Sequence, residues 1–208
     1  MKYVVVAICI AILATPLLAA TITVKTDATS TGASVASTSD PRLTSGDISG
    51  LTFTPVGTDN EGSFTAVPPG APLGTLVVQV PPECGYYCGQ SGFVMVTFTL
   101  PSSFSAPFLT GAGNVDDGGY AFLNGNTISA QLSEFGNTAF STNTAAYFLP
   151  GVNTLVVSDS NSGGGPSAVV FFADVTYSTG TTPEPSTLLT FGSGILGLAG
   201  LARKRFNL

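Results

Sequence analysis

The chain has 208 residues, with 6 lysines and arginines, 12 aspartates and glutamates, no histidine and a net charge of −6. Because imidazole is absent, Ser-His-Asp and Cys-His catalytic arrangements and histidine metal sites are excluded. Lys25 and Arg42 are the only basic residues between positions 21 and 182. Phosphate binding needs clustered basic side chains, so we expect no nucleic-acid partner.

The first 20 residues have the pattern of a secretory signal peptide. Lys2 supplies the positive charge, residues 4–13 the apolar region, and residues 16–20 a cleavage region with small side chains. We predict cleavage near Ala19 or Ala20, and an uncleaved membrane anchor is the alternative. Removal of this segment leaves an exported domain.

Residues 21–182 form one predicted all-β domain, large enough for a core of its own. They show no helical periodicity, but short apolar or alternating runs separated by Gly, Pro, Asn and Asp, which is typical of strands and turns. Ile22 and Val24 could form a short first strand, and residues 28–40 have the composition of a loop. Nine further strands predict an antiparallel β-sandwich. They are 48–54, 62–67, 73–80, 92–100, 108–113, 120–123, 145–149, 154–158 and 168–177.

Two of these runs are apolar on both faces. Phe93 and Met95 alternate with Val94 and Val96, and residues 169–172 are Val-Val-Phe-Phe. Such runs suit strands central to a two-sheet sandwich, or edges that loops cover.

The exported domain contains two cysteines, Cys84 and Cys88, while Cys9 lies in the signal peptide. An even pair in an oxidising compartment predicts a disulfide, here around the short loop Gly-Tyr-Tyr. A redox or metal-binding pair is the alternative, although a zinc site lacks a histidine to complete it.

A succession of turns and strands in the second half resembles a known family. An Asp-Asp-Gly-Gly turn at 116–119 leads into an aromatic strand that ends at Asn124 and Gly125, a strong hairpin signal. A Gly-Val-Asn corner at 151–153 then leads into the next strand. The succession resembles galactose-binding-like jelly-roll domains over about residues 93–177. The resemblance implies a jelly-roll sandwich.

The carboxylates give no sign of an enzyme. Glycoside hydrolysis needs two carboxylates on either side of a cleft, and no spacing singles out such a pair. We therefore expect no catalytic residues and no enzyme activity. The candidates are Asp116, Asp117, Glu134, Asp159 and Asp174.

Asp116 and Asp117 are the candidate metal ligands, because carboxylates and the carbonyls of a Gly-rich loop are the hard oxygen ligands that calcium prefers. The galactose-binding-like resemblance implies a structural calcium ion. The alternative is that both side chains hydrogen-bond their own turn. No other cofactor is expected.

Carbohydrate binding has its own candidates. Tyr86 and Tyr87, in the predicted disulfide loop, offer two large amphipathic rings, and sugars bind to aromatic faces. Asp117, Asn124 and Asn126 could add hydrogen bonds if their loops converge. The alternative is that the tyrosines pack over the end of a sheet.

The last 26 residues have three parts. Pro183, Glu184 and Pro185 cannot continue a strand or helix, because two proline rings fix φ and remove two donors. The uncharged residues 186–202 would span about 26 Å as a helix, near the minimum for crossing a bilayer. Residues 203–208 begin with a basic cluster that would remain on the cytoplasmic side. The cluster consists of Arg203, Lys204 and Arg205.

The motif, apolar segment and basic tail, in this order, closely resemble the bacterial PEP-CTERM sorting signal. An ordinary C-terminal anchor is the alternative. The resemblance implies that exosortase, a membrane protease-transpeptidase, is a processing partner together with the secretion machinery. The membrane-tethered precursor would then be passed to the cell surface or extracellular matrix.

Two functions follow. The first is a non-catalytic structural protein of the bacterial surface or exopolysaccharide matrix. The second is a carbohydrate-binding module displayed by the same route, with extracellular polysaccharide as its partner.

Overall fold

The computed structural model describes residues 18–58, 66–80, 91–134, 136–162, 167–179 and 193–194. The chain divides into two units. Residues 19–178 form one unit, and residues 1–18 with 179–208 form the other. Of the second unit, Leu18, Thr179, Ser193 and Gly194 are described.

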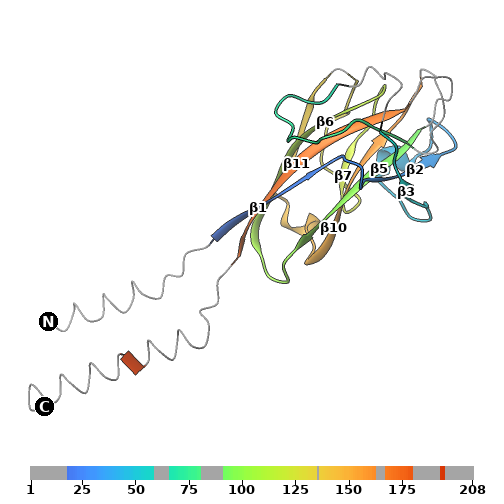
Figure 1. Cartoon of the computed structure of the whole chain (residues 1–208). Coiled ribbons are helices and arrows are strands. Elements are labelled where there is room, and N and C mark those ends of the chain that lie inside the picture. The colour runs from blue at the N-terminus through green and yellow to red at the C-terminus, as the bar shows by residue number, and fades with distance from the viewer. Residues whose placement is uncertain are drawn as a thin grey trace, which may run out of the picture. The chain divides into compact units, whose positions relative to one another are not determined.

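The unit 19–178 is a sandwich of two antiparallel sheets (Figure 1). The five-stranded sheet contains β1 Leu18–Lys25, β4 Val78–Gln79, β6 Ser105–Val115, β9 Thr138–Thr142 and β11 Ala168–Thr179. The six-stranded sheet contains β2 Thr31–Val35, β3 Thr54–Pro55, β5 Ser91–Leu100, β7 Ala121–Leu123, β8 Asn126–Thr127 and β10 Gly151–Asp159. Two short helices accompany them, α2 Arg42–Ser45 and the 3-10 helix η1 Ala145–Tyr147.

The strand order is that of a jelly roll, in which one long hairpin is folded so that successive strand pairs fall in alternate sheets. From the tip outward, β7 pairs with β8, β6 with β9, β5 with β10 and β4 with β11. The first and third pairs lie in the six-stranded sheet, and the other two in the five-stranded sheet. Folding of the hairpin also brings β11 beside β6 and β10 beside β7. The predicted jelly-roll-like antiparallel β-sandwich is confirmed.

The tip of this hairpin is the Asn-Gly turn. Asn124 and Gly125 have φ of 50° and 79°, so both occupy the positive-φ region that a two-residue hairpin turn of this type requires. The sequence-based prediction of a turn here is confirmed.

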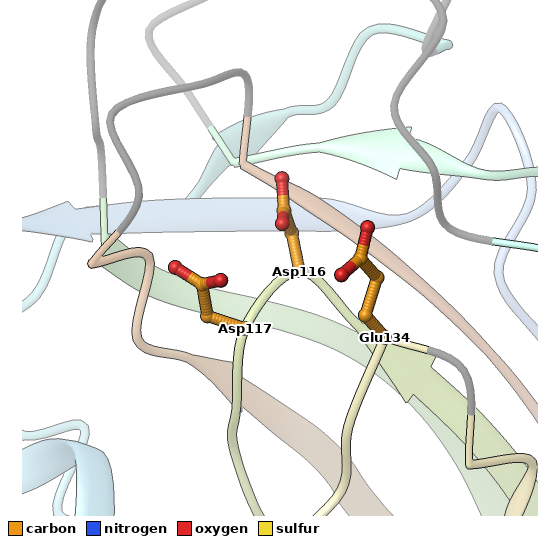
Figure 2. A group of neighbouring side chains, drawn as sticks. All are labelled: Asp116, Asp117 and Glu134. Carbon is orange, nitrogen blue, oxygen red and sulfur yellow. The ribbon is translucent and has the colours of Figure 1, made fainter.

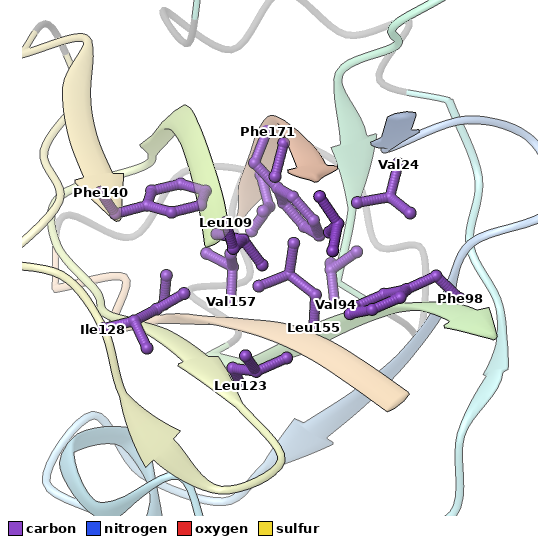
Figure 3. Packing of buried hydrophobic residues seen from close by; sticks show 14 of the residues in the cluster. Val24, Val94, Phe98, Leu109, Leu123, Ile128, Phe140, Leu155, Val157 and Phe171 are labelled. Carbon is purple, nitrogen blue, oxygen red and sulfur yellow. The ribbon is translucent and has the colours of Figure 1, made fainter. Parts of the chain in front are cut away.

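Apolar side chains from both sheets interdigitate between them (Figure 3). Val94, Leu155 and Val157 from the six-stranded sheet and Leu109 and Phe171 from the other are fully buried. Full burial of each such side chain stabilises the fold by roughly 1.5–3 kcal/mol.

A second, smaller core covers the outer face of the six-stranded sheet. Phe93 and Phe122 point away from the first core and pack against Val35 and Leu43, because successive side chains of a strand point to opposite faces. The prediction that the run around Phe93 is a central strand is thereby confirmed, since β5 lies between β2 and β10.

The sandwich has two distinct ends. β1 and β11 are antiparallel neighbours, with Thr26 donating to the carbonyl of Phe171 at 2.9 Å and Thr23 bonded to Asp174. Ala19 and Ser178 therefore lie at the same end, which we call the terminus end. The opposite end, where β11 begins, is about 33 Å away along ten residues of strand.

Five regions differ from the predicted strands. Residues 28–40 contain β2, whose Thr-Gly-Ala-Ser-Val sequence resembles a loop but pairs with β5 through five residues. Residues 145–149 are not a strand; they contain η1, which connects strands of different sheets. In place of the predicted strands 48–54 and 73–80, the structure contains only the short strands β3 and β4. β9 was not among the strands predicted from the sequence. The predicted strand 62–67 lies outside the described residues except at its last two positions.

The predictions of a signal peptide and of a C-terminal membrane helix can be compared with the structure only in part. β1 begins at Leu18, before the predicted end of the signal peptide, so cleavage after Ala20 would leave Thr21–Lys25 of this strand. No helix formed by the described residues has the length and hydropathy needed to cross a membrane. Within the predicted membrane helix, 186–202, only Ser193 and Gly194 are described.

Replacement of Gly46 by alanine should strongly destabilise the fold. Gly46 ends α2 with φ of 72°, and a Cβ there would lie 2.3 Å from the ring of Phe122. Left-handed backbone and overpacking together should lower the free energy of unfolding by roughly 2–4 kcal/mol. Denaturant unfolding followed by circular dichroism measures this change.

The matched control is Gly50→Ala. Gly50 has nearly the same φ, 73°, but no atom lies within 4 Å of the position that an added Cβ would occupy, so only the backbone cost of about 1 kcal/mol remains. Equal losses in the two variants would contradict the packing argument.

Candidate metal and ligand sites

Three carboxylates gather at the end of the sandwich opposite the terminus end. Asp116 and Asp117 directly follow β6, and Glu134 lies just before β9 (Figure 2). One carboxylate oxygen from each lies within 4.8 Å of the others. We call this group the acidic cluster. The sequence singled out Asp116 and Asp117 as metal candidates, but Glu134 joins them only because β6 and β9 pair.

Backbone hydrogen bonds fix the first two members. The N–H of Asp116 donates to the carbonyl of Ala168 at 2.9 Å, at the start of β11. Asp117 has φ of 65°, and its Oδ2 accepts from the N–H and hydroxyl of Ser162 at 2.6 and 3.0 Å. Asp117 therefore links the end of β6 to the segment after β10. Its carboxylate bonds a residue 45 positions away in the sequence.

Asp159 is a fourth carboxylate at the same end. It is the last residue of β10 and is fully buried. Its Oδ2 accepts the hydroxyl of Ser167, while its Oδ1 has no hydrogen-bond partner among the residues that the structure describes. Burial raises the pKa of Asp159 well above its ordinary value, and the nearby charges of Asp116 and Asp117 raise it further, against the opposing effect of the Ser167 hydrogen bond.

The fifth candidate carboxylate lies elsewhere. Asp174 is near the middle of β11, between the buried Ala173 and Val175, and accepts the hydroxyl of Thr23 at 2.6 Å. Alternation along the strand places it on the outer face of the five-stranded sheet. Four of the five candidates thus converge, and Asp174 does not.

The proposed sugar-binding residues that the structure describes do not form one site. Asp117 precedes β7, whereas Asn124 and Asn126 follow it. The side chain of Asn126 donates to the carbonyls of Leu123 and Asn124, both at 3.2 Å, and so closes the hairpin turn.

Asn124 and Asn153 form a structural network that the sequence did not reveal. Asn124 donates to Tyr147 O and to Asn153 Oδ1, at 2.8 and 2.7 Å, and accepts the N–H of Thr154. The fully buried Asn153 also bonds both backbone groups of Leu149 and the carbonyl of Gly151. The Gly-Val-Asn corner was the one sequence signal for this network, but its partners are distant in sequence.

Among the hollows formed by the described residues are two on the surface of the sandwich. One, of about 510 Å³, is lined by residues 45–49, which include the apolar Ile48, and by Asn124, Gly125 and Thr154. The other, of about 350 Å³, lies between β1 and β5 and includes Lys25, Asp27 and several threonines. Neither contains a member of the acidic cluster.

The two basic residues of the sandwich are both engaged. Arg42 forms an ion pair with Asp40 at 2.6 Å, and its hydrogen bonds lower the pKa of Asp40 to about 2. Lys25 donates to the carbonyl of Leu73. The two cations lie on different segments, and no other basic residue follows them in the sequence before Arg203.

Several predicted site residues lie outside the described part of the chain. They are Cys84, Tyr86, Tyr87, Cys88, Pro183, Glu184, Pro185, Arg203, Lys204 and Arg205.

Comparison with protein families identifies the C-terminal segment. Residues 181–205 match the model of the PEP-CTERM protein-sorting motif. The chain carries an exosortase sorting signal. It is therefore an exported protein that exosortase processes at the membrane for display at the cell surface, as the three-part tail predicted. Comparison with curated protein sequences finds no significant match.

Several glycosidases are among the solved structures that resemble the chain. β-Glucuronidase from Ruminococcus gnavus has 16% identity and a TM-score of 0.41, over 74% of this chain and 29% of that chain. A putative β-galactosidase from Bacteroides fragilis has 13% identity and a TM-score of 0.40, over 74% and 23%. β-D-Glucuronidase from Dictyoglomus thermophilum has 10% identity and a TM-score of 0.40, over 74% and 28%.

The chain spans less than a third of the length of each of these proteins. No inference about activity follows from similarity at this level. The jelly roll is established by the strand order of the chain itself.

Replacement of Asn153 by alanine should destabilise the sandwich by roughly 2–4 kcal/mol, because it leaves several polar partners without their hydrogen bonds. Asn126→Ala is the matched control, since it removes bonds only to two turn carbonyls and should cost about 1 kcal/mol. Denaturant unfolding compares the two variants. An Asn153 variant as stable as the Asn126 variant would contradict a central role for the network.

Proposed function

We propose that the sandwich is a non-catalytic structural body that its sorting signal delivers to the bacterial surface or exopolysaccharide matrix. The observation that carries the proposal is the match of residues 181–205 to the PEP-CTERM sorting motif. A domain delivered in this way has to remain folded outside the cell. The two apolar cores and the nested strand pairs support that role.

The placement of the chain ends suits display. Ala19 and Ser178 lie at the same end of the sandwich, so the chain enters and leaves it there. A body attached through its terminus end leaves the acidic cluster at the other end of β11, about 33 Å away.

The chemistry of the described carboxylates supports the non-catalytic part of the proposal. A glycosidase needs one carboxylate on each side of a substrate cleft. Asp116, Asp117 and Glu134 instead lie together in one group, and neither surface hollow includes them. Asp117 is moreover hydrogen-bonded to Ser162.

The sorting step can be tested by intact mass spectrometry of the protein in its native host, with and without the exosortase gene. We expect a product that ends near Pro183–Pro185 only when exosortase is present. Replacement of Pro183 and Pro185 by alanine should prevent this cleavage, whereas Thr179→Ala, outside residues 181–205, should leave it intact. Retention of Arg203, Lys204 and Arg205 in both strains would contradict the proposal.

A carbohydrate-binding module is the second candidate. The hollow of about 510 Å³ favours it, because Asp47, Asn124 and Thr154 are among the residues that line a space large enough for a sugar. The predicted disulfide loop with Tyr86 and Tyr87, which lies outside the described residues, is the other candidate position for this activity.

Affinity for the polysaccharide of the native host tests this candidate at both positions. If the sugar site is in the hollow, the Asp47→Ala, Thr154→Ala double variant should bind the polysaccharide roughly tenfold more weakly or worse, a loss of about 1.4 kcal/mol of binding free energy. The Tyr86→Ala, Tyr87→Ala double variant should then bind it as well as the unmodified protein does. A site in the tyrosine loop predicts the reverse. Surface display of a protein that binds no host polysaccharide would leave the structural role and eliminate the binding role.

A further inference from the structure

The five-stranded sheet has two open edges, formed by β1 and β9. Its strand order is β1-β11-β6-β9, so each of these two strands has a described neighbour on one side only. Among the described residues, β9 makes no backbone hydrogen bond to a segment other than β6. The hollow of about 350 Å³ is lined by Thr23, Val24 and Lys25 of β1 and by residues 95–97 of β5, but by no residue of β11. It therefore lies beside the edge of β1 that faces away from β11.

Neither edge has the features that usually prevent a strand from pairing with another chain. Such features are charged side chains, proline and bulges along the edge strand. β9 has the sequence Thr-Ala-Phe-Ser-Thr, without charge or proline. β1 has a single charged residue, Lys25, at its last position. The backbone groups that point outward from these strands are therefore available to an added strand.

The directions of the strands make the two edges complementary to each other. β1, β11, β6 and β9 are successively antiparallel, so β9 runs opposite to β1. A second copy in the same orientation would therefore present its β1 to the β9 of the first copy as an antiparallel neighbour. The sheet would continue from one copy to the next. A head-to-tail contact of this kind repeats in every copy and produces a ring or a filament.

The pairing within the sheet indicates the register of such a contact. The hydrogen bonds between β1 and β11 place Lys25 beside Phe172. Phe172 pairs with Ala112, and Ala112 pairs with Ala139. Lys25 and Ala139 are therefore at the same height on the two edges. Two copies side by side would place Ala139 of one opposite Lys25 of the other.

The side chains match at this register. The buried Phe140 would lie beside the buried Val24 of the neighbouring copy, and the exposed Ser141 beside its exposed Thr23. Pairs of an aromatic with a β-branched residue, and of threonine with serine, stabilise neighbouring strands.

The charges at the two edges are also complementary. Glu134 lies just before β9, near the height of Val115, whose N–H donates to the carbonyl of Ser133. Lys25 of the neighbouring copy would be about two residues away along the strand, roughly 7 Å. Opposite charges at this separation favour this orientation of the two copies.

We infer that the sandwich binds a second copy of this chain by pairing β9 with β1, so that the five-stranded sheets join head to tail. Signal-peptide cleavage after Ala20 retains residues 22–26, which would face 138–142. The inference deepens the proposed structural role and rests on it, because display on one surface brings the copies together.

Sedimentation velocity of the protein purified from its native host in mild detergent, at increasing concentrations, tests this assembly. We expect monomers to be replaced by dimers, trimers and larger species. The intact mass of the same sample reports the C-terminal processing, so a failure of assembly is distinguished from a failure of sorting. Monomers at every concentration, or an assembly that stops at a dimer, would overturn the inference.

A charge exchange between the two edges is the decisive experiment. Ala139→Lys should weaken the association roughly tenfold or more, because it places two positive charges opposite each other at every junction. Lys25→Glu should also weaken it, because the new charge repels Glu134. The double variant Lys25→Glu, Ala139→Lys should restore the association. Within one copy these two positions are three strand spacings apart, about 14 Å, so a contact inside the monomer does not explain such a rescue.

Thr110→Lys is the matched control. Thr110 is exposed like Ala139 and belongs to the same sheet, but it lies on β6, which has a neighbour on both sides. This variant should associate as the unmodified protein does, and circular dichroism should show that every variant is folded. Loss of association in Thr110→Lys, or a double variant that stays as weak as the single variants, would rule out the pairing of β9 with β1.

Discussion

Burial of the inner faces of the two sheets against each other is the interaction on which the rest of the structure depends. Leu109 and Phe171 on one sheet meet Val94, Leu155 and Val157 on the other, without exposed surface. The two sheets can meet in this way because each strand of the hairpin on one side of the Asn-Gly turn has its partner on the other side. Folding of that hairpin then places successive pairs in alternate sheets.

The same topology determines what lies at each end of the sandwich. β1 and β11 are antiparallel neighbours, so the chain enters and leaves at the terminus end. The ends of β6 and β10 and the start of β9 meet at the opposite end, with Asp116, Asp159 and Glu134. The points where the chain enters and leaves the sandwich are consequently separated from the acidic cluster by the length of a strand.

Polar residues have two different roles in this fold. Asn124 and Asn153 use their side chains to bond backbone groups where the chain crosses between sheets, and these bonds stabilise the corner before β10. The carboxylates of the acidic cluster instead gather at one end of the sandwich, where Asp117 also bonds Ser162. Residue type alone does not separate the two roles, because both sets are polar residues next to glycine-rich turns.

The sequence by itself determined the features that depend on neighbouring residues. These are the sorting signal at 181–205, the all-β class, the Asn124–Gly125 turn and the central strands with two apolar faces, such as β5. Only the tertiary structure decided the features that depend on pairing between distant segments. β2 is a strand because it lies beside β5, residues 145–149 contain a 3-10 helix because they connect two sheets, and Glu134 joins Asp116 because β9 pairs with β6. For the same reason, Asn124 bonds Asn153 and does not form a ligand site with Asp117. Local periodicity carries no information about register between strands, and register decides which side chains meet.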